Sequence, residues 1–396
     1  MKKILFLVFA FVMFMCFCAA EAGESCTAVA EQAIAQRVAG RNFPSVFQAW
    51  STADNIKGQD ELSVAARHDL VWHGVIWYGL HWDTEPPGLA EALVPESIKQ
   101  GRIVRKALLK LNPNIILIAE IRYRDASRNF LPKDHHWWMR DEKGNLVKGW
   151  AEGRFICMDF TNPDFRRHVV RRAKAVVNSG VVDGVMLDWW HDDEHRLALV
   201  KAVREAIGDK YLIITNVNER ITAESAPYIN GYFMECTKTK TARDWQTIAA
   251  TLTWAEENLR EPRVNCVETW YHKSRMDLNL MRSVTTLALT HSNGYCLFSD
   301  PNPLPSADHF HNWYPFWNKT LGKPVSKGVD KDDGTVVREF ENGTVVYNPP
   351  GNKPVTVTFA EPRTSLATGQ SSKSHTVNSW DGDILLRKTL YSPTTK

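Results

Sequence analysis

Eight short apolar runs recur between residues 43 and 300, and most of them are separated by a stretch in which apolar residues follow helical spacing. Parallel strands need such crossovers, and because both of their faces are buried they read as nearly continuous apolar runs. The expected strands cover residues 43–50, 69–82, 114–121, 181–190, 211–217, 231–236, 263–271 and 294–300. This alternation predicts an α/β chain that closes into a (β/α)8 TIM barrel.

An open, doubly wound parallel sheet is the alternative for the same pattern. We favour the barrel because no glycine-rich phosphate loop follows any expected strand, whereas polar residues recur at nearly every strand's carboxyl end. The expected helices cover residues 28–38, 96–111, 163–180, 197–208, 244–259 and 278–291. The aromatic stretch His311–Leu321 is expected to form the last barrel helix.

The pattern changes at Val325. Asn342 and Gly343 lie between two alternating runs within residues 336–349, which is the strongest short signal for a hairpin. Residues 355–359 and 383–388 supply further expected strands. We therefore predict a barrel domain over residues 23–324 and a small all-β, sandwich-like module over residues 325–396 that packs behind it.

The chain begins with the features of a secretory signal peptide. Two lysines precede an apolar block over residues 4–20, and small residues follow up to Ala22, so cleavage is expected before Gly23. An uncleaved anchor is the alternative, but no second hydrophobic span follows, so we expect no stable membrane insertion after cleavage. The mature protein is expected to be secreted or periplasmic.

Charge and cysteine content narrow the class of protein further. The formal net charge is +3 and there is no basic cluster, so no nucleic-acid partner is expected. Five cysteines remain outside the leader, and four of them lie in apolar, strand-like runs: Cys157, Cys236, Cys266 and Cys296, with Cys26 as the fifth. The odd total, with four of the five in such runs, predicts buried free thiols rather than a disulfide framework.

Residues at the carboxyl ends of the expected strands are the candidates for function, because barrel enzymes place their active sites at that edge. These candidates are Trp50, His81, Trp82, Glu120, Asp188, Trp189, Trp190, Asn216, Glu235, Glu268, Trp270 and Asp300. The alternative for each carboxylate is a purely structural role, in which it caps the following helix or pairs with an arginine.

Strand parity separates the residues that face the barrel interior from those that do not, since successive side chains point to opposite faces. Asp188 shares a face with Met186, and Glu235 shares one with Phe233, so each carboxylate ends a row of apolar residues. Asp183 lies on the opposite face at the other end of its strand, and we interpret it as structural.

Two carboxylates in a pocket rich in tryptophan point to glycoside hydrolysis. One group protonates the leaving oxygen while the other acts as nucleophile or activates water, and the two therefore need different pKa values. The indoles offer flat surfaces on which sugar rings stack. The cluster His191–His195 offers imidazoles and carboxylates for a metal, but a run directly after a strand more often forms a solvated loop and the start of a helix.

Four motifs resemble one family: DGVMLD at 183–188, the carboxylate Glu235 in YFMEC, DFTNP at 159–163, and R-x-F-x-N-G-x-V-x-x-N-P at 338–349. Together, and in this order, they look like the hypothetical glycosyl hydrolase family fifteen, and more distantly like endo-α-1,4-polygalactosaminidase and α-galactosidase barrels. The resemblance spans Phe43 to the C-terminus. It implies that Asp188 is the nucleophile and Glu235 the acid/base, with no cofactor.

Glu268 keeps an alternative open. In another large group of glycosidase barrels the strand-four acid works with a strand-seven glutamate, but there an Asn-Glu pair ends strand four, whereas this chain has Leu187 and Asp188. We interpret Glu268 as a substrate-binding residue or an alternate catalyst, and the other non-catalytic candidates as substrate-binding residues.

The sequence thus predicts a secreted glycoside hydrolase that cleaves a poly- or oligosaccharide with a carboxylate pair. Two alternatives remain: a non-catalytic carbohydrate-binding barrel, in which the acids only accept hydrogen bonds from hydroxyls, and a metal-dependent hydrolase. Whether the reaction retains or inverts the anomeric configuration depends on the separation of the carboxylates.

Overall fold

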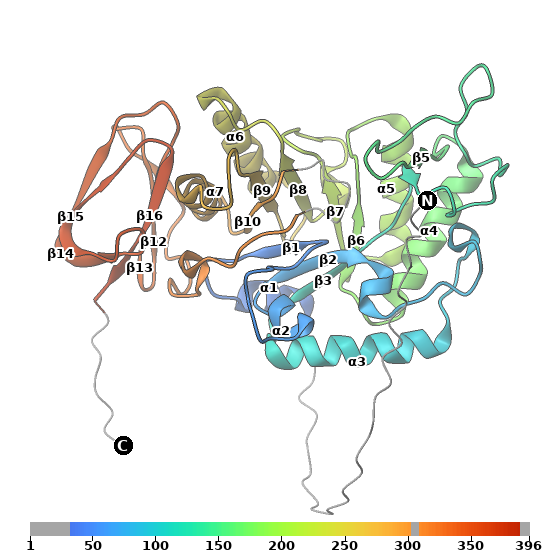
Figure 1. Ribbon diagram of the computed structural model, residues 1–396, viewed down its shortest axis with the longest axis horizontal. Coiled ribbons are helices and arrows are strands. Elements are labelled where there is room, and N and C mark those ends of the chain that lie inside the picture. Colours follow the sequence, from blue (N-terminus) through green and yellow to red (C-terminus); the bar gives the residue numbers. More distant parts are fainter. Residues whose placement is uncertain (1–31, 302–308, 389–396) are drawn as a thin grey trace, which may run out of the picture. The chain divides into compact units, whose positions relative to one another are not determined.

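The computed structural model of the protein describes residues 32–301 and 309–388 (Figure 1). Eight parallel strands form one sheet in sequential order, and the backbone N–H of Cys296 donates to the Ser45 carbonyl at 3.0 Å, which joins the last strand to the segment before the first. The strands are β1 Phe47–Ala49, β2 Leu70–Gly74, β3 Ile116–Glu120, β6 Gly184–Leu187, β7 Leu212–Asn216, β8 Gly231–Cys236, β9 Cys266–Trp270 and β10 Tyr295–Ser299. The predicted barrel is therefore confirmed.

Seven α-helices accompany the barrel in the described part of the chain: α1 Ile34–Gly40, α2 Glu61–Ala65, α3 Pro95–Leu111, α4 Pro163–Asn178, α5 Glu194–Ile207, α6 Ala242–Asn258 and α7 Leu278–His291. Local signals set where they begin. The Asn162 side chain accepts a hydrogen bond from the Asp164 N–H ahead of Pro163, and the Asp193 side chain caps α5. None of the described helices is long and apolar enough to span a bilayer. The predicted signal peptide, residues 1–22, and Cys26 lie outside the described residues.

The predicted helix over His311–Leu321 is wrong. This segment contains only the 3-10 turn η4, Pro315–Trp317, because Pro315 has no N–H to donate and the surrounding side chains anchor to separate elements. The Trp317 indole N–H donates to Thr285 on α7 at 2.8 Å, and the Tyr314 hydroxyl donates to the Arg275 carbonyl at 2.6 Å. Such scattered partners hold the segment extended. The other 3-10 turns are η1 Val75–Tyr78, η2 Pro87–Leu89 and η3 Ala226–Tyr228.

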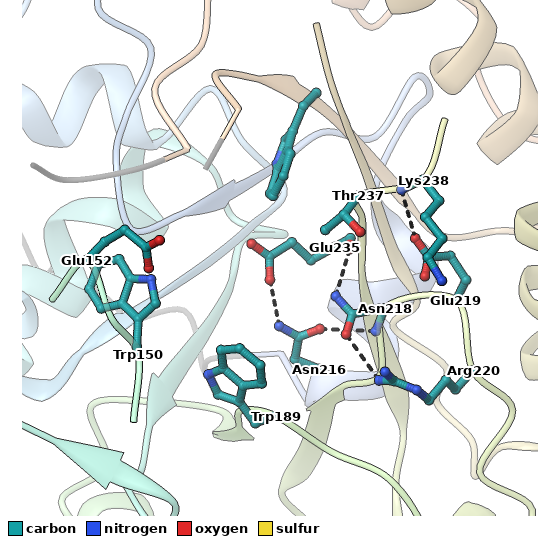
Figure 2. Close-up of a pocket in the computed structure, with 11 residues that line it drawn as sticks. Trp150, Glu152, Trp189, Asn216, Asn218, Glu219, Arg220, Glu235, Thr237 and Lys238 are labelled. Atoms are coloured by element: carbon teal, nitrogen blue, oxygen red, sulfur yellow. Dashed lines mark hydrogen bonds between the residues drawn. The ribbon is translucent and has the colours of Figure 1, made fainter. Parts of the chain in front are cut away.

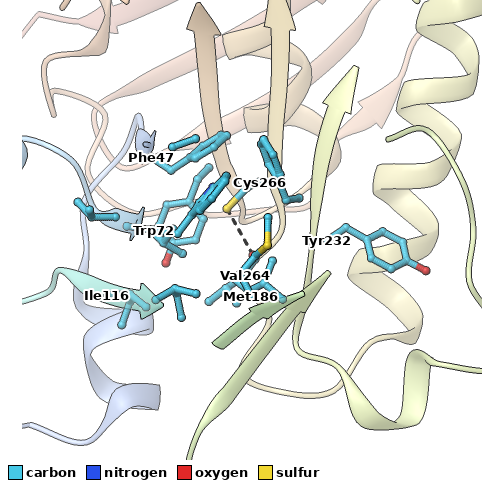
Figure 3. Packing of buried hydrophobic residues seen from close by; sticks show 14 of the residues in the cluster. Phe47, Trp72, Ile116, Met186, Tyr232, Val264 and Cys266 are labelled. Atoms are coloured by element: carbon cyan, nitrogen blue, oxygen red, sulfur yellow. Dashed lines mark hydrogen bonds between the residues drawn. The ribbon is translucent and has the colours of Figure 1, made fainter. Parts of the chain in front are cut away.

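The barrel interior follows the predicted strand parity. The ring of Phe233 packs against Phe47 and Trp72, with centroid separations of 5.7 and 5.3 Å. Figure 3 shows the adjacent Tyr232 pointing the other way, and its ring stacks on Trp254 of α6 at 6.2 Å. Glu235 has the parity of Phe233, so β8 directs it inward. The predicted free thiols are also confirmed as buried: Cys157, Cys236, Cys266 and Cys296.

Asp183 lies just before β6, at the amino end of the barrel, and is fully engaged there. Arg37 of α1 and Arg105 of α3 both donate to its carboxylate, the latter at 2.7 Å, and the Leu117 backbone N–H donates at 2.8 Å. The next residue is Gly184, where a Cβ atom would come within 2.3 Å of the Leu212 carbonyl oxygen. The motif DGVMLD thus combines a structural ion-pair centre and a close strand contact with Asp188 at the opposite edge.

Replacing Asp183 with Ala is expected to lower the free energy of unfolding by about 3–5 kcal/mol, because Arg37 and Arg105 would remain buried without their counter-charge. Urea denaturation followed by tryptophan fluorescence measures the loss. The activity of the remaining folded protein should be unchanged. An unchanged unfolding midpoint would contradict the structural role of this acid.

A six-stranded antiparallel sheet follows the barrel in the order β11-β12-β13-β16-β14-β15. Its strands are β11 Val329–Asp330, β12 Val336–Phe340, β13 Gly343–Asn348, β14 Val355–Ser365, β15 Ser371–Val377 and β16 Asp381–Arg387. The predicted hairpin is confirmed, with Phe340 paired to Gly343 across the turn. Asp381 accepts hydrogen bonds from Arg282 of α7 at 2.7 and 2.8 Å, and Arg338 donates to the Leu289 and Ser292 carbonyls at the end of α7. The sheet therefore covers α7, while the domain boundary after residue 324 stays a prediction.

Candidate active site

Asn216, the last residue of β7, lies between the two predicted catalytic carboxylates. Its side-chain nitrogen donates to Asp188 Oδ1 and to Glu235 Oε2, each at 2.9 Å, and Figure 2 shows the second of these bonds. Because both bonds share one nitrogen, the two carboxylate oxygens lie no more than twice 2.9 Å apart. Three neighbouring strands thus bring an acid pair and its bridging amide to one point of the barrel edge.

A cavity of about 330 Å³ opens beside Glu235. In Figure 2 the carboxylate of Glu235 lies on the same side of Asn216 as the indoles of Trp150 and Trp189. The residues that line this cavity are Trp150, Glu152, Trp189, Asn216, Asn218, Glu219, Arg220, Glu235, Thr237, Lys238 and Trp270. Carboxylates for proton transfer, an amide for hydrogen bonding and indoles for stacking thus surround one cavity.

Trp150 and Glu152 come from the long loop between two very short strands, β4 Asp125–Ala126 and β5 Ile156–Cys157. The Trp150 backbone N–H donates to the buried carboxylate of Asp125 at 2.8 Å, and Arg124 pairs with the same carboxylate at 2.6 Å. This loop carries no strand or helix periodicity, so sequence reasoning missed both residues. It also missed Asn218, Glu219 and Arg220, which lie beyond the last residue of β7.

Trp189 is one of the predicted substrate-binding residues that reach the cavity, together with Asn216 and Trp270. Its φ of 53° is a left-handed conformation that a bulky residue rarely adopts, and its side chain is 45% exposed. The Arg124 guanidinium lies 4.3 Å from the ring centroid. The indole is thus presented to solvent and held from one side by a cation.

Glu235 has a strongly raised pKa. Burial, and to a smaller degree the charges of Glu268 and Asp188, raise the pKa of its carboxyl group to about 8, against the opposing effects of His309 and the Asn216 amide. At neutral pH the group therefore holds its proton. A protonated carboxylic acid at the barrel edge is suited to donate that proton to a leaving oxygen.

Asp188 accepts hydrogen bonds from the Asn216 amide and from the Trp189 backbone N–H, each at 2.9 Å. Burial raises the pKa of this carboxyl group above its ordinary value, and Arg122 and the two hydrogen-bond donors offset part of that rise. The cation and the donors stabilise the carboxylate form, which nucleophilic attack requires.

Glu268 lies behind this pair rather than in the cavity. Its side chain is fully buried on β9, where the Ser299 hydroxyl and the His309 ring donate to it, the Nδ1 of His309 at 2.8 and 3.0 Å from its two oxygens. A direct substrate contact or a role as alternate catalyst, as predicted, does not fit a side chain with no exposed surface. Sequence reasoning missed His309, since no expected strand ends there.

Glu235, Glu268 and His309 form a group whose possible metal-ligand atoms lie within 4.8 Å of one another. His309 and Glu268 are already joined by a direct hydrogen bond. A cation would have to break that bond, so the arrangement fits a hydrogen-bonded pair better than a metal site. The acids of the His191–His195 cluster are also engaged, since Asp193 caps α5 and Asp192 accepts a hydrogen bond from Ser225 at 2.5 Å.

The strand expected over 69–82 ends at Gly74, so His81 and Trp82 do not end a strand. They lie in the loop between the turns η1 and η2, and neither lines the cavity beside Glu235. The Arg172 guanidinium of α4 lies 3.7 Å from the Trp82 ring centroid, and that contact occupies the indole.

Two further candidates bind partners within the protein. Trp190 is 1% exposed and its indole N–H donates to Ser225 at 3.0 Å, so the ring cannot stack on a sugar. Asp300 accepts two hydrogen bonds from the Arg275 guanidinium, each at 2.6 Å. Neither residue lines the cavity beside Glu235, and each side chain binds its own partner within the protein. A substrate contact by Asp300 stays a prediction.

Glu120 and Trp50 lie next to the site without lining the cavity. Glu120 is buried and pairs with Arg122 at 3.0 Å, and the Arg122 guanidinium lies 5.5 Å from the Trp50 ring centroid. Both residues thus contact the arginine that favours ionised Asp188. A substrate contact by either residue stays a prediction.

No protein-family model and no curated protein matches the sequence of this chain. Solved structures do match its fold. A maltogenic α-amylase from Thermotoga neapolitana has 11% identity and a TM-score of 0.53, with 88% of this chain and 100% of that chain covered. An α-amylase from Lactobacillus plantarum has 11% identity and a TM-score of 0.53, with 90% and 100% covered. An α-amylase from Malbranchea cinnamomea has 12% identity and a TM-score of 0.51, with 88% and 96% covered. At such identity the likeness establishes the fold.

Proposed function

We propose that this protein is a glycoside hydrolase that cleaves a poly- or oligosaccharide with Asp188 as nucleophile and Glu235 as acid/base. The observation that carries the proposal is the Asn216 bridge, which holds two carboxyl groups side by side at the edge of a tryptophan-lined cavity. The structures of similar fold support it, because they include α-amylases. The finer resemblance to the hypothetical glycosyl hydrolase family fifteen belongs to this proposal as well.

The reaction proceeds in two steps. Glu235 gives its proton to the glycosidic oxygen while an Asp188 oxygen attacks the anomeric carbon, so the bond to the leaving group breaks and a glycosyl ester forms. A water molecule then gives a proton to the Glu235 carboxylate and attacks the same carbon, which releases Asp188. Asn216 donates to both carboxylates in the resting state and so keeps them in register.

The product should retain the anomeric configuration of the substrate. The two bridged oxygens lie within twice 2.9 Å of each other, which favours the separation of about 5–5.5 Å between carboxyl groups in retaining enzymes over the roughly 6.5–9.5 Å of inverting ones. Proton NMR of the first product formed, recorded before mutarotation, measures the configuration. An inverted first product would show that Asp188 activates water instead.

A screen of the mature protein against a glycan panel tests the function itself. The panel begins with α-glucans, since the structures of similar fold include α-amylases. Asp188→Asn is the inactive control. Binding without hydrolysis, unchanged in that variant, would favour the carbohydrate-binding barrel, and loss of hydrolysis on chelation would favour the metal-dependent hydrolase.

We place the enzyme outside the cytoplasm, secreted or periplasmic. The support for this is the leader pattern over residues 1–22. Mass determination of the protein isolated from its natural host, with Gly23 as the expected first residue, tests it.

A further inference from the structure

Three elements place a buried polar group directly behind the proposed acid/base. Glu268 lies on β9, Ser299 ends β10, and His309 comes from the segment after β10. Glu268 has no exposed side-chain surface, and the His309 side chain is 4% exposed. Glu268 and His309 therefore do not form a surface ion pair, and neither residue takes part in the two hydrolytic steps.

The contacts of Glu268 indicate the charge of His309. A buried carboxylate is costly unless a cation or several donors compensate it. In the described part of the chain its only neutral donor is the Ser299 hydroxyl, and the only cationic group at ion-pair distance is the His309 ring, at 2.8 Å. His309 is thus best accommodated as an imidazolium. The rings of Phe233 and Trp72 cover it, at centroid separations of 5.8 and 6.1 Å.

This imidazolium also faces Glu235, since the nearest possible ligand atoms of Glu235, Glu268 and His309 lie within 4.8 Å of one another. Two other ionisable residues lie near this pair. The charge of Asp188, which follows β6, affects Glu235, and His311 lies close to His309. Glu235 therefore has two carboxylates and one cation around it.

We propose that His309, held in place by Glu268, is a positioning residue that stabilises the carboxylate form of Glu235 between the two steps of hydrolysis. The inference rests on the proposed function. After the first step Glu235 has lost its proton and would face Glu268 and the esterified Asp188 in a dry pocket. The His309 cation offsets the charge of Glu235 at that stage, which lets Glu235 act as base on water.

Replacing His309 with Gln tests this role. An opposite charge within a few ångströms lowers a carboxyl pKa by about 1–3 units, and the substitution removes that charge. The alkaline limb of the pH–rate profile should therefore move to higher pH by about one unit. With an aryl glycoside, whose departure needs little proton donation, the second step should become slower and the glycosyl ester should accumulate. Mass spectrometry of the intact protein measures that ester.

The double variant His309→Gln/Glu268→Gln separates charge from packing. It removes one cation and one anion together, so the alkaline limb should return to within about half a pH unit of the wild type. A purely structural role for His309 predicts lower rates in both variants with the limb unmoved. That result, or a downward shift in the single variant, would overturn the proposal.

A titration without substrate keeps this test independent of the function. The ¹³C chemical shift of the Glu235 carboxyl carbon, assigned by comparison with Glu235→Gln, reports its protonation in the resting protein. A higher Glu235 pKa in His309→Gln, together with no hydrolysis of any glycan, would support the electrostatic role and contradict the proposed function. Glycan hydrolysis together with an unchanged Glu235 pKa would support the proposed function and contradict the electrostatic role of His309.

Discussion

Asp188→Asn should lower kcat by roughly 10⁴-fold while the protein keeps its fold. The amide lacks the negative charge that attacks the anomeric carbon, yet its oxygen can still accept the hydrogen bonds from Asn216 and the Trp189 N–H. Steady-state kinetics on the substrate identified by the glycan screen measure the loss, and circular dichroism with thermal unfolding checks the fold. Full activity in this variant would refute the assignment.

Chemical rescue separates a nucleophile from a residue that only supports the site. In Asp188→Ala, azide should occupy the vacated space and attack the anomeric carbon of an activated glycoside, which yields a glycosyl azide of inverted configuration. Asp183→Ala is the matched control, since its acid lies at the other end of the same motif and is bound by two arginines. Azide should change neither its rate nor its product.

Glu235→Gln should lower the hydrolysis of an unactivated glycoside by about 10²–10⁴-fold. A glutamine cannot give up a proton to the leaving oxygen. A glycoside with a dinitrophenyl leaving group needs no such proton, so its first step should be nearly unaffected. Pre-steady-state release of dinitrophenol measures that step, and an equal loss with both substrates would contradict the acid role.

The same variant tests the pH dependence. Because the pKa of Glu235 is raised to about 8, the proton-bearing form dominates below that pH and is lost as the pH rises through it. The wild-type rate should therefore fall on the alkaline side near pH 8, and this limb should be absent in Glu235→Gln. A limb that persists in the variant would belong to another group.

Sequence reasoning was correct where the periodicity of a strand and the order of strands and helices lead to the same conclusion. The alternation of apolar runs and helical stretches predicted the barrel, and the two-residue period of β8 placed Glu235 on the side of Phe233. It went wrong where a strand stopped early, as before His81, and where aromatic residues bind separate elements, as in residues 311–321. In those places individual side-chain contacts, not periodicity, decide the backbone.

By itself the sequence determined the fold and which acids stand at the carboxyl edge, because strand burial and strand parity are local properties that repeat along the chain. Only the tertiary structure decided which candidates act together. Asn216 joins Asp188 to Glu235, whereas Asp300 forms an ion pair with Arg275. The charge behind Glu235 came from His309, which is 41 positions from its partner Glu268. Charge and burial depend on neighbours that are distant in sequence, and no local pattern records them.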